Sequence, residues 1–161
     1  YFYEKILTDS SLKWIVSNRA LKNGKALTEV KSFKEKYSYA WDYLIFRRIK
    51  GDATHCIEVK LINQNRIHFS RSIKQGEEWF FFYQIGLQAG ISYTDHNSTI
   101  SDGYDLVNGL NFRRRPLSEK IKTLTKIAYE AIPMGLIVKP SFMFYLLMRY
   151  IRIIIPIKNN P

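Results

Sequence analysis

Two adjacent carboxylates open the most aromatic segment of this 161-residue chain. Glu77 and Glu78 follow Gly76 directly and precede five consecutive aromatic residues, 79–83. On a helix, a rotation of about 100° per residue places Glu78 on the side of Phe81, which should be buried, and Glu77 on a more polar side. The helix N-terminus favours an ionised carboxylate, whereas apolar surroundings favour the protonated form. A carboxylate between these influences is suited to act as a general base, although acids also occur in first helical turns for purely structural reasons.

Two other polar segments contain residue types that could bind a ligand. "GDATHC" (residues 51–56) brings Asp52 and His55 together just before a predicted helix, but its ligand types and spacing make a poor zinc site, and a simple turn is the alternative. "NFRRRP" (residues 111–116) holds Arg113 and Arg115, whose guanidinium groups could bind phosphate in a bidentate manner. The alternative is a solvated basic linker or a contact with lipid headgroups.

The elements that position these residues include both strands and helices, and the family resemblance given below implies an α/β fold. Asn23-Gly24 is a hairpin turn signal between the apolar stretches 13–18 and 25–33. Residues 38–48 suit a strand or a short helix. We further expect helices over 57–65, 77–89 and 118–132, with Ser118 as the cap of the last one, short strands over 66–70 and 90–95, and a loop over 96–111.

The positive charge is concentrated near the C-terminus. Residues 113–161 contain 10 Lys and Arg against 2 acids, whereas residues 1–112 contain 15 against 12. The apolar stretch Ser141–Pro156 lies in this basic part, and only Arg149 and Arg152 interrupt it between residues 142 and 155. It is shorter than the roughly 20 residues that span a bilayer. We therefore predict a helix that lies on an anionic membrane surface, with packing on the protein core as the alternative.

One cysteine, Cys56, rules out a disulfide within the chain, and residues 1–10 do not resemble a secretory signal. The chain starts with Tyr1, which leads us to expect a fragment or a processed product.

The stretch from about residue 40 to residue 120 resembles the acceptor-side half of bacterial family-2 glycosyltransferases of the GT-A fold. The order and spacing of single residues carry this resemblance: a short strand, then Gly-Glu-acid-Trp opening an aromatic helix, a second strand, a Tyr-containing loop and a Leu-Ser helix start. The matching residues are Asn65, Ile67, Phe69, Gly76, Glu77, Trp79, Phe81, Ala89, Tyr93, Tyr104, Leu117 and Ser118.

The resemblance implies roles for the candidate residues. Glu78 stands where such enzymes have the catalytic base of inverting sugar transfer, usually an Asp, and Glu77 would support it. Trp79 would stack on a sugar, while Asp52 and His55 would bind hydroxyl groups of the acceptor. Arg113 and Arg115 would bind the donor diphosphate.

The resemblance also implies a half that is missing here. The family's nucleotide-binding strands and its Asp-x-Asp motif, which holds Mn²⁺ or Mg²⁺, should precede this region, and the chain contains no Asp-x-Asp. We therefore expect residues 1–112 to be the acceptor-side part of a glycosyltransferase domain and residues 113–161 a basic, amphipathic helical tail. The chain alone should be inactive and should contain no metal ligands.

The implied function is transfer of a single sugar from a nucleotide-sugar to a saccharide or lipid-linked acceptor, in surface polysaccharide synthesis on the cytoplasmic face of the cell membrane. The alternative is a non-catalytic basic module that binds anionic membrane or nucleic acid. Nucleic acid is the weaker choice, because the basic residues lie beside an apolar helix rather than along an aromatic strand face.

Overall fold

The computed structural model describes Asp9 and residues 11–31, 34–51, 53–70, 78–101 and 116–155. They form two compact units, the first from residues 1–68 and 81–105 and the second from residues 69–80 and 106–161. The division falls within helix α3 (Glu78–Gly86), whose first three residues belong to the second unit. The fold is mixed α/β, as predicted, with small sheets and several helices. The predicted domain boundary between residues 112 and 113 lies outside the described residues.

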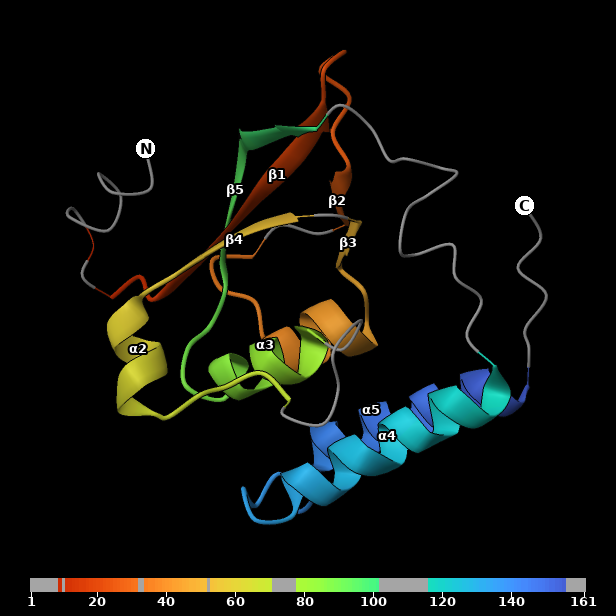
Figure 1. The fold of residues 1–161 in the computed structure, drawn as a ribbon. Coiled ribbons are helices and arrows are strands. Elements are labelled where there is room, and N and C mark those ends of the chain that lie inside the picture. Colours follow the sequence, from red (N-terminus) through yellow and green to blue (C-terminus); the bar gives the residue numbers. More distant parts are fainter. Residues whose placement is uncertain are drawn as a thin grey trace. The chain divides into compact units, whose positions relative to one another are not determined.

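The first unit is built on a mixed three-stranded sheet (Figure 1). Strand β1 (Trp14–Leu21) occupies its centre, with β4 (Ala53–Ile57) antiparallel on one side and β5 (Ser92–Ser101) parallel on the other. The central strand is the most apolar of the three at its start, and its residues 14–18 are all buried. Because β1 pairs with a strand on each side, its backbone N–H and C=O groups do not form an open sheet edge.

The hairpin turn predicted at Asn23-Gly24 is confirmed. Gly24 has a φ of +82°, a conformation that glycine adopts without steric cost, and its N–H donates to the carbonyl of Leu21 at 2.9 Å. The returning chain forms one bridge with β1, between Ala20 and Ala26, and the Arg19 backbone N–H donates to Thr28 Oγ1 at 3.2 Å. Strand β2 (Thr28–Val30) pairs with β3 (Ile49–Gly51) in a separate two-stranded sheet.

The segment predicted as a strand or a short helix over 38–48 contains a short π-helix, η1 (Tyr39–Ile45). Its buried Asp42 accepts hydrogen bonds from Lys34 Nζ at 2.7 Å and from the Ser38 backbone N–H at 2.9 Å, and Arg48 Nε lies 3.2 Å away. Burial acts to raise the pKa of the Asp42 carboxyl, but the bonds from Lys34 and Ser38 and the charges of Lys34 and Arg48 outweigh it and lower that pKa. The ionised carboxylate therefore ties both ends of η1 to the neighbouring chain.

Two predictions between these elements are wrong. Residues 66–70 form no strand, because the Gln84 side chain bonds the His68 backbone where a neighbouring strand would. The amide nitrogen of Gln84 donates to the His68 carbonyl at 2.9 Å, and its amide oxygen accepts from the His68 N–H at 3.5 Å. The loop predicted over 96–111 is strand over residues 96–101, and its remainder, 102–111, lies outside the described residues. Helix α2 (Val59–Gln64) matches the core of the predicted helix 57–65.

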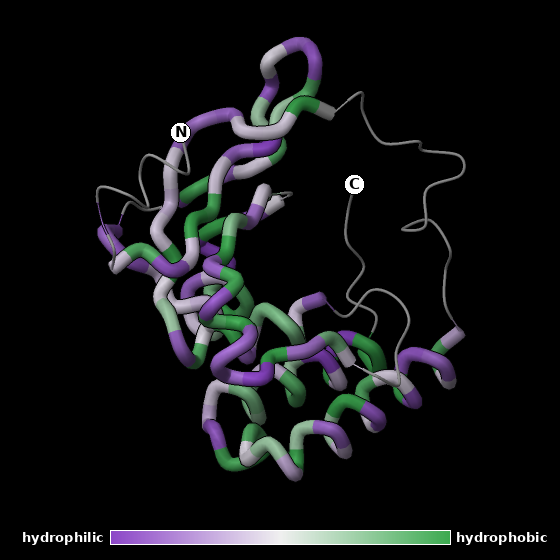
Figure 2. The backbone as a smooth tube through the Cα atoms, turned by 60° about the vertical axis from the view of Figure 1, so that its left-hand side comes forward, coloured by the Kyte–Doolittle hydropathy of each residue, from purple (hydrophilic) through white to green (hydrophobic). Residues whose placement is uncertain are grey.

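The second unit contains two amphipathic helices, α4 (Leu117–Ala131) and α5 (Pro140–Ile154). Hydrophobic and hydrophilic residues alternate along α4, whereas α5 is mostly hydrophobic (Figure 2). Thr125 Oγ1 of α4 and Tyr150 Oη of α5 form a hydrogen bond of 2.9 Å. Ser118 is not the cap of α4, because the helix begins one residue earlier and Pro116 holds the capping position. The buried residues of this helix pair are Thr123, Leu124, Ile127, Ala131, Leu136, Phe142, Tyr145 and Leu146.

Candidate functional site

The predicted base lies at the very start of its helix. Glu78 is the first residue of α3 and is exposed, whereas the next two residues, Trp79 and Phe80, are buried. We expected Glu78 to share the buried side of the helix. It does not, since its side chain is exposed. Glu77 lies outside the described residues.

Aromatic packing within the second unit holds this helical turn in place. The Trp79 ring lies 4.8 Å from that of Tyr145 and 6.1 Å from that of Phe142, centroid to centroid. The Phe80 ring lies 6.3 Å from Phe142. Aromatic pairs in such geometries contribute about 0.5–1.5 kcal/mol each beyond the burial of their surface. The carboxylate of Glu78 thus projects to solvent from a backbone that two buried side chains anchor.

The same packing bears on the role predicted for Trp79. Only 7 % of this side chain is exposed, and its ring faces Tyr145 and Phe142. A sugar needs an open ring face to stack on, so in this conformation Trp79 serves the core rather than a ligand. Sugar stacking by Trp79 stays a prediction.

His55 is placed by the first unit, at the centre of β4. Its partner across the ladder is Val16, and the Trp14 indole Nε1–H donates to His55 Nδ1 at 3.2 Å. The imidazole stacks on the Phe82 ring at 4.3 Å between centroids. Burial among these aromatic rings lowers the pKa of His55 to about 4. The imidazole is therefore neutral at pH 7, and because Nδ1 accepts a hydrogen bond, its proton is on Nε2.

His55 lies in an aromatic cluster that could not be predicted from the sequence. Tyr43 from η1 lies 5.9 Å from the imidazole and 5.1 Å from Tyr39, which in turn lies 5.1 Å from Trp14. These residues come from four separate segments, so no local pattern could show that they meet. The available signal was the high aromatic content, 24 Trp, Tyr and Phe in 161 residues.

A second polar feature lies where β5 bulges against β1. The register between the two strands shifts on both sides of Asn18. The Asn18 side chain donates to the Asp95 carbonyl at 2.8 Å and accepts from the Tyr93 hydroxyl at 2.5 Å. Burial and the charge of Asp95 raise the pKa of Tyr93, so its hydroxyl keeps the proton that it donates. Bulges commonly re-aim side chains next to functional sites, and Tyr93 is one of the residues that carry the family resemblance.

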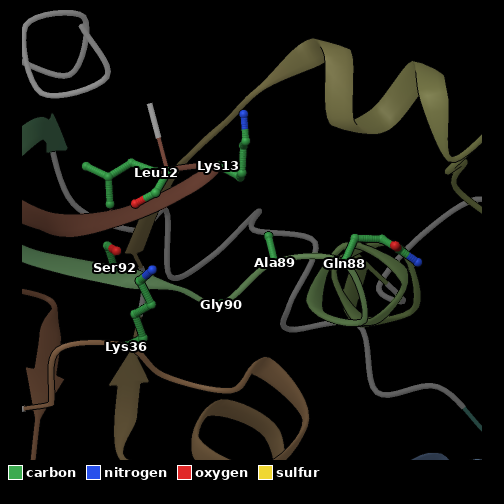
Figure 3. Close-up of a pocket in the computed structure, with 8 residues that line it drawn as sticks. Leu12, Lys13, Lys36, Gln88, Ala89, Gly90 and Ser92 are labelled. Carbon is green, nitrogen blue, oxygen red and sulfur yellow. The ribbon is translucent and has the colours of Figure 1, made fainter. Parts of the chain in front are cut away.

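A small cavity of about 200 Å³ opens where the parallel strands β1 and β5 begin (Figure 3). Lys13 and Lys36 are its charged residues, and Lys13 is already paired with Glu58 at 3.0 Å. The turn that follows α3 also lines it, through Gln88 and Ala89, and the C-terminus of a helix favours cations over anions. The cavity is below the usual size of a ligand pocket, and we assign no ligand to it.

The remaining predicted site residues, Asp52, Arg113 and Arg115, lie outside the described residues. Among those that are described, Glu78 and Trp79 belong to the second unit and His55 to the first. In the described part of the chain, no three His, Cys, Asp or Glu residues are grouped closely enough to hold a metal ion. A resident divalent metal therefore does not fit these residues. Within the same limits, no helix is long and apolar enough to cross a membrane.

Comparisons with known proteins add no family. No protein-family model, no curated protein and no solved structure matches this chain.

Proposed function

We propose that this chain is the acceptor-side portion of an inverting, non-processive glycosyltransferase with a GT-A fold. It would act on a saccharide or lipid-linked acceptor in surface polysaccharide synthesis, at the cytoplasmic face of the cell membrane. One observation carries the proposal: Glu78 is an exposed carboxylate on the first residue of α3, fixed by two buried aromatic neighbours. A general base needs this combination of access to substrate and a rigid support.

In the proposed reaction the Glu78 carboxylate accepts the proton of the acceptor hydroxyl. The acceptor oxygen attacks the anomeric carbon of the donor sugar from the side opposite the leaving group. The bond between that carbon and the diphosphate oxygen breaks, and the nucleoside diphosphate leaves with the electron pair. The sugar configuration inverts, and protonated Glu78 returns its proton to solvent.

The other residues have supporting roles in this proposal. Neutral His55 has an Nε2–H that can donate to a hydroxyl of the acceptor, since Trp14 occupies Nδ1. Glu77 and Asp52 are proposed to support the base and the acceptor, and Arg113 and Arg115 to bind the donor diphosphate. The Mn²⁺ or Mg²⁺ expected in such an enzyme finds no ligand group in the described part of the chain, so we derive no step through it.

The reaction class can be tested with the complete gene product that contains this sequence. In the presence of Mn²⁺, we expect it to release nucleoside diphosphate from one member of a panel of uridine and guanosine diphosphate sugars. The release should require an added acceptor, supplied as a membrane lipid or saccharide extract. Proton NMR of the product should show an anomeric configuration opposite to that of the donor. A product that retains the configuration, or release that does not depend on an acceptor, would contradict the proposal.

A further inference from the structure

Helix α5 has two apolar sides, one buried and one exposed. Phe142, Tyr145 and Leu146 are buried. The other side is exposed and contains no charged residue. Its members are Met143, Phe144, Leu147, Ile151, Ile154 and Ile155 at the end of the helix, which have exposed fractions of 38–63 %. We refer to these six residues as the α5 outer face.

The α5 outer face is continuous. At about 100° per residue, its six side chains fall within an arc of about 120°. Arg149 and Arg152 lie outside that arc, and the Arg149 guanidinium lies 6.0 Å from the ring centroid of buried Tyr145. The exposed face of α5 is therefore apolar, and Arg149 belongs to the packed side.

The charges around this face define the kind of partner. Lys139 is the residue before α5 and is exposed, and exposed Arg152 lies in its last turn, so a cation stands at each end. On α4, Lys120, Lys122 and Lys126 are also exposed. From residue 131 to residue 161 the sequence contains no Asp or Glu. An apolar strip bounded by cations and free of acids is complementary to the headgroup region of an anionic bilayer.

We infer that α5 is a membrane-surface helix whose outer face inserts among the lipids of an anionic bilayer, with Lys139 and Arg152 at the headgroup level. The helix has 15 residues, fewer than the roughly 20 that cross a bilayer, so it lies along the surface rather than spanning it. This inference does not depend on the proposed sugar transfer, because it concerns binding and its test uses no activity.

The test follows the position of single labelled residues in the full chain. Cys56 is the one cysteine of the sequence, so Cys56→Ser allows a polarity-sensitive fluorophore to be placed elsewhere. With Leu147→Cys as the labelling site, vesicles of equal parts phosphatidylglycerol and phosphatidylcholine should shift the emission to the blue. With Ala26→Cys, an exposed residue of the β1 hairpin, the emission should stay unchanged. Vesicles of phosphatidylcholine alone should give a much smaller shift.

A variant pair separates insertion from general charge attraction. Leu147→Asp with Ile151→Asp places two acids on the α5 outer face and should lower vesicle flotation by about tenfold or more. Asn63→Asp with Gln64→Glu adds the same charge to exposed positions on α2 and should leave most of the flotation intact. High salt should release only part of the wild-type chain, since apolar insertion is not screened.

Other results would overturn the inference. Equal loss of flotation in both variants would mean that charge alone attracts the chain to vesicles. A wild-type chain that stays in the soluble fraction at low salt would rule out membrane binding. A dimer that dissociates on Leu147→Asp with Ile151→Asp, in the absence of vesicle binding, would assign the outer face to a second copy of the chain.

Discussion

At the scale of single residues, His55 shows how the fold changes the chemistry of a side chain. Its imidazole would titrate near pH 6.5 in an unfolded chain, whereas burial lowers its pKa to about 4 in the folded protein. Between these values the unfolded state binds a proton that the folded state does not. His55 therefore contributes stability above pH 6.5 that is lost as the pH falls toward 4.

This linkage predicts a measurable slope. Lowering the pH from 7 to 5 should decrease the free energy of unfolding by about 2 kcal/mol through His55 alone. The His55→Gln variant keeps an acceptor for the Trp14 indole but does not titrate, so the decrease should be smaller by that amount. Urea unfolding of both proteins at the two pH values measures the difference. If wild type and variant lose equal stability, His55 is not buried in its neutral form.

The Glu78 position was predictable from the sequence, and its surroundings were not. An acid directly before an aromatic run predicts a helix start, which α3 confirms. The helical wheel placed Glu78 among buried residues because it uses angular position alone, whereas exposure depends on tertiary packing. The His55 cluster escaped prediction for another reason: Trp14, Tyr43 and Phe82 meet only through tertiary contacts.

At the scale of elements, α3 and η1 pack closely because of one glycine. A Cβ added at Gly86 would lie 2.6 Å from the Cβ of Tyr39, a distance that real side chains do not tolerate. Tyr39 is buried and its ring contacts Trp14, so it cannot move aside without disturbing the cluster around His55.

We therefore predict that Gly86→Ala destabilises the protein by about 1–3 kcal/mol, the usual range for overpacking, despite the better helix propensity of alanine. Gly90→Ala is the matched control, since its nearest neighbour would be 3.6 Å away, an ordinary van der Waals contact. Thermal unfolding of both variants gives the comparison. Equal melting temperatures for the two would show that the contact between α3 and η1 is looser than described.

The element boundaries show which local sequence patterns predict the structure correctly. The Asn23-Gly24 turn and the α4 helix were predicted correctly, because turn chemistry and helical periodicity act within a few residues. The pairing partner of the strand after the turn was not predictable, because β2 pairs with β3, some 20 residues further along the chain. Likewise, the polar residues of β5 read as a loop, yet they form a strand because β1 supplies backbone partners and Ser17 and Asn18 bond the side chains of Ser98 and Tyr93.

At the scale of the whole molecule, the chain combines two kinds of surface. The sequence has a net charge of +11, and most of the excess lies within residues 113–161. The described part of the second unit contains six of these ten Lys and Arg residues together with the α5 outer face, whereas the described residues of the first unit contribute a sheet with polar and aromatic clusters. The α/β class was predicted together with the family resemblance, but the mixed order β4-β1-β5 was not, because pairing order depends on contacts distant in sequence.

The central claim is that Glu78 is the base of a sugar transfer, and its removal tests this most directly. In the complete gene product, Glu78→Gln should lower kcat by about 10²–10⁴-fold, the usual range for loss of a general base, with an unchanged melting temperature. Glu119→Gln, at another exposed acid in a first helical turn, should retain full turnover. Near-full turnover by Glu78→Gln together with loss of turnover by Glu77→Gln would contradict the assignment.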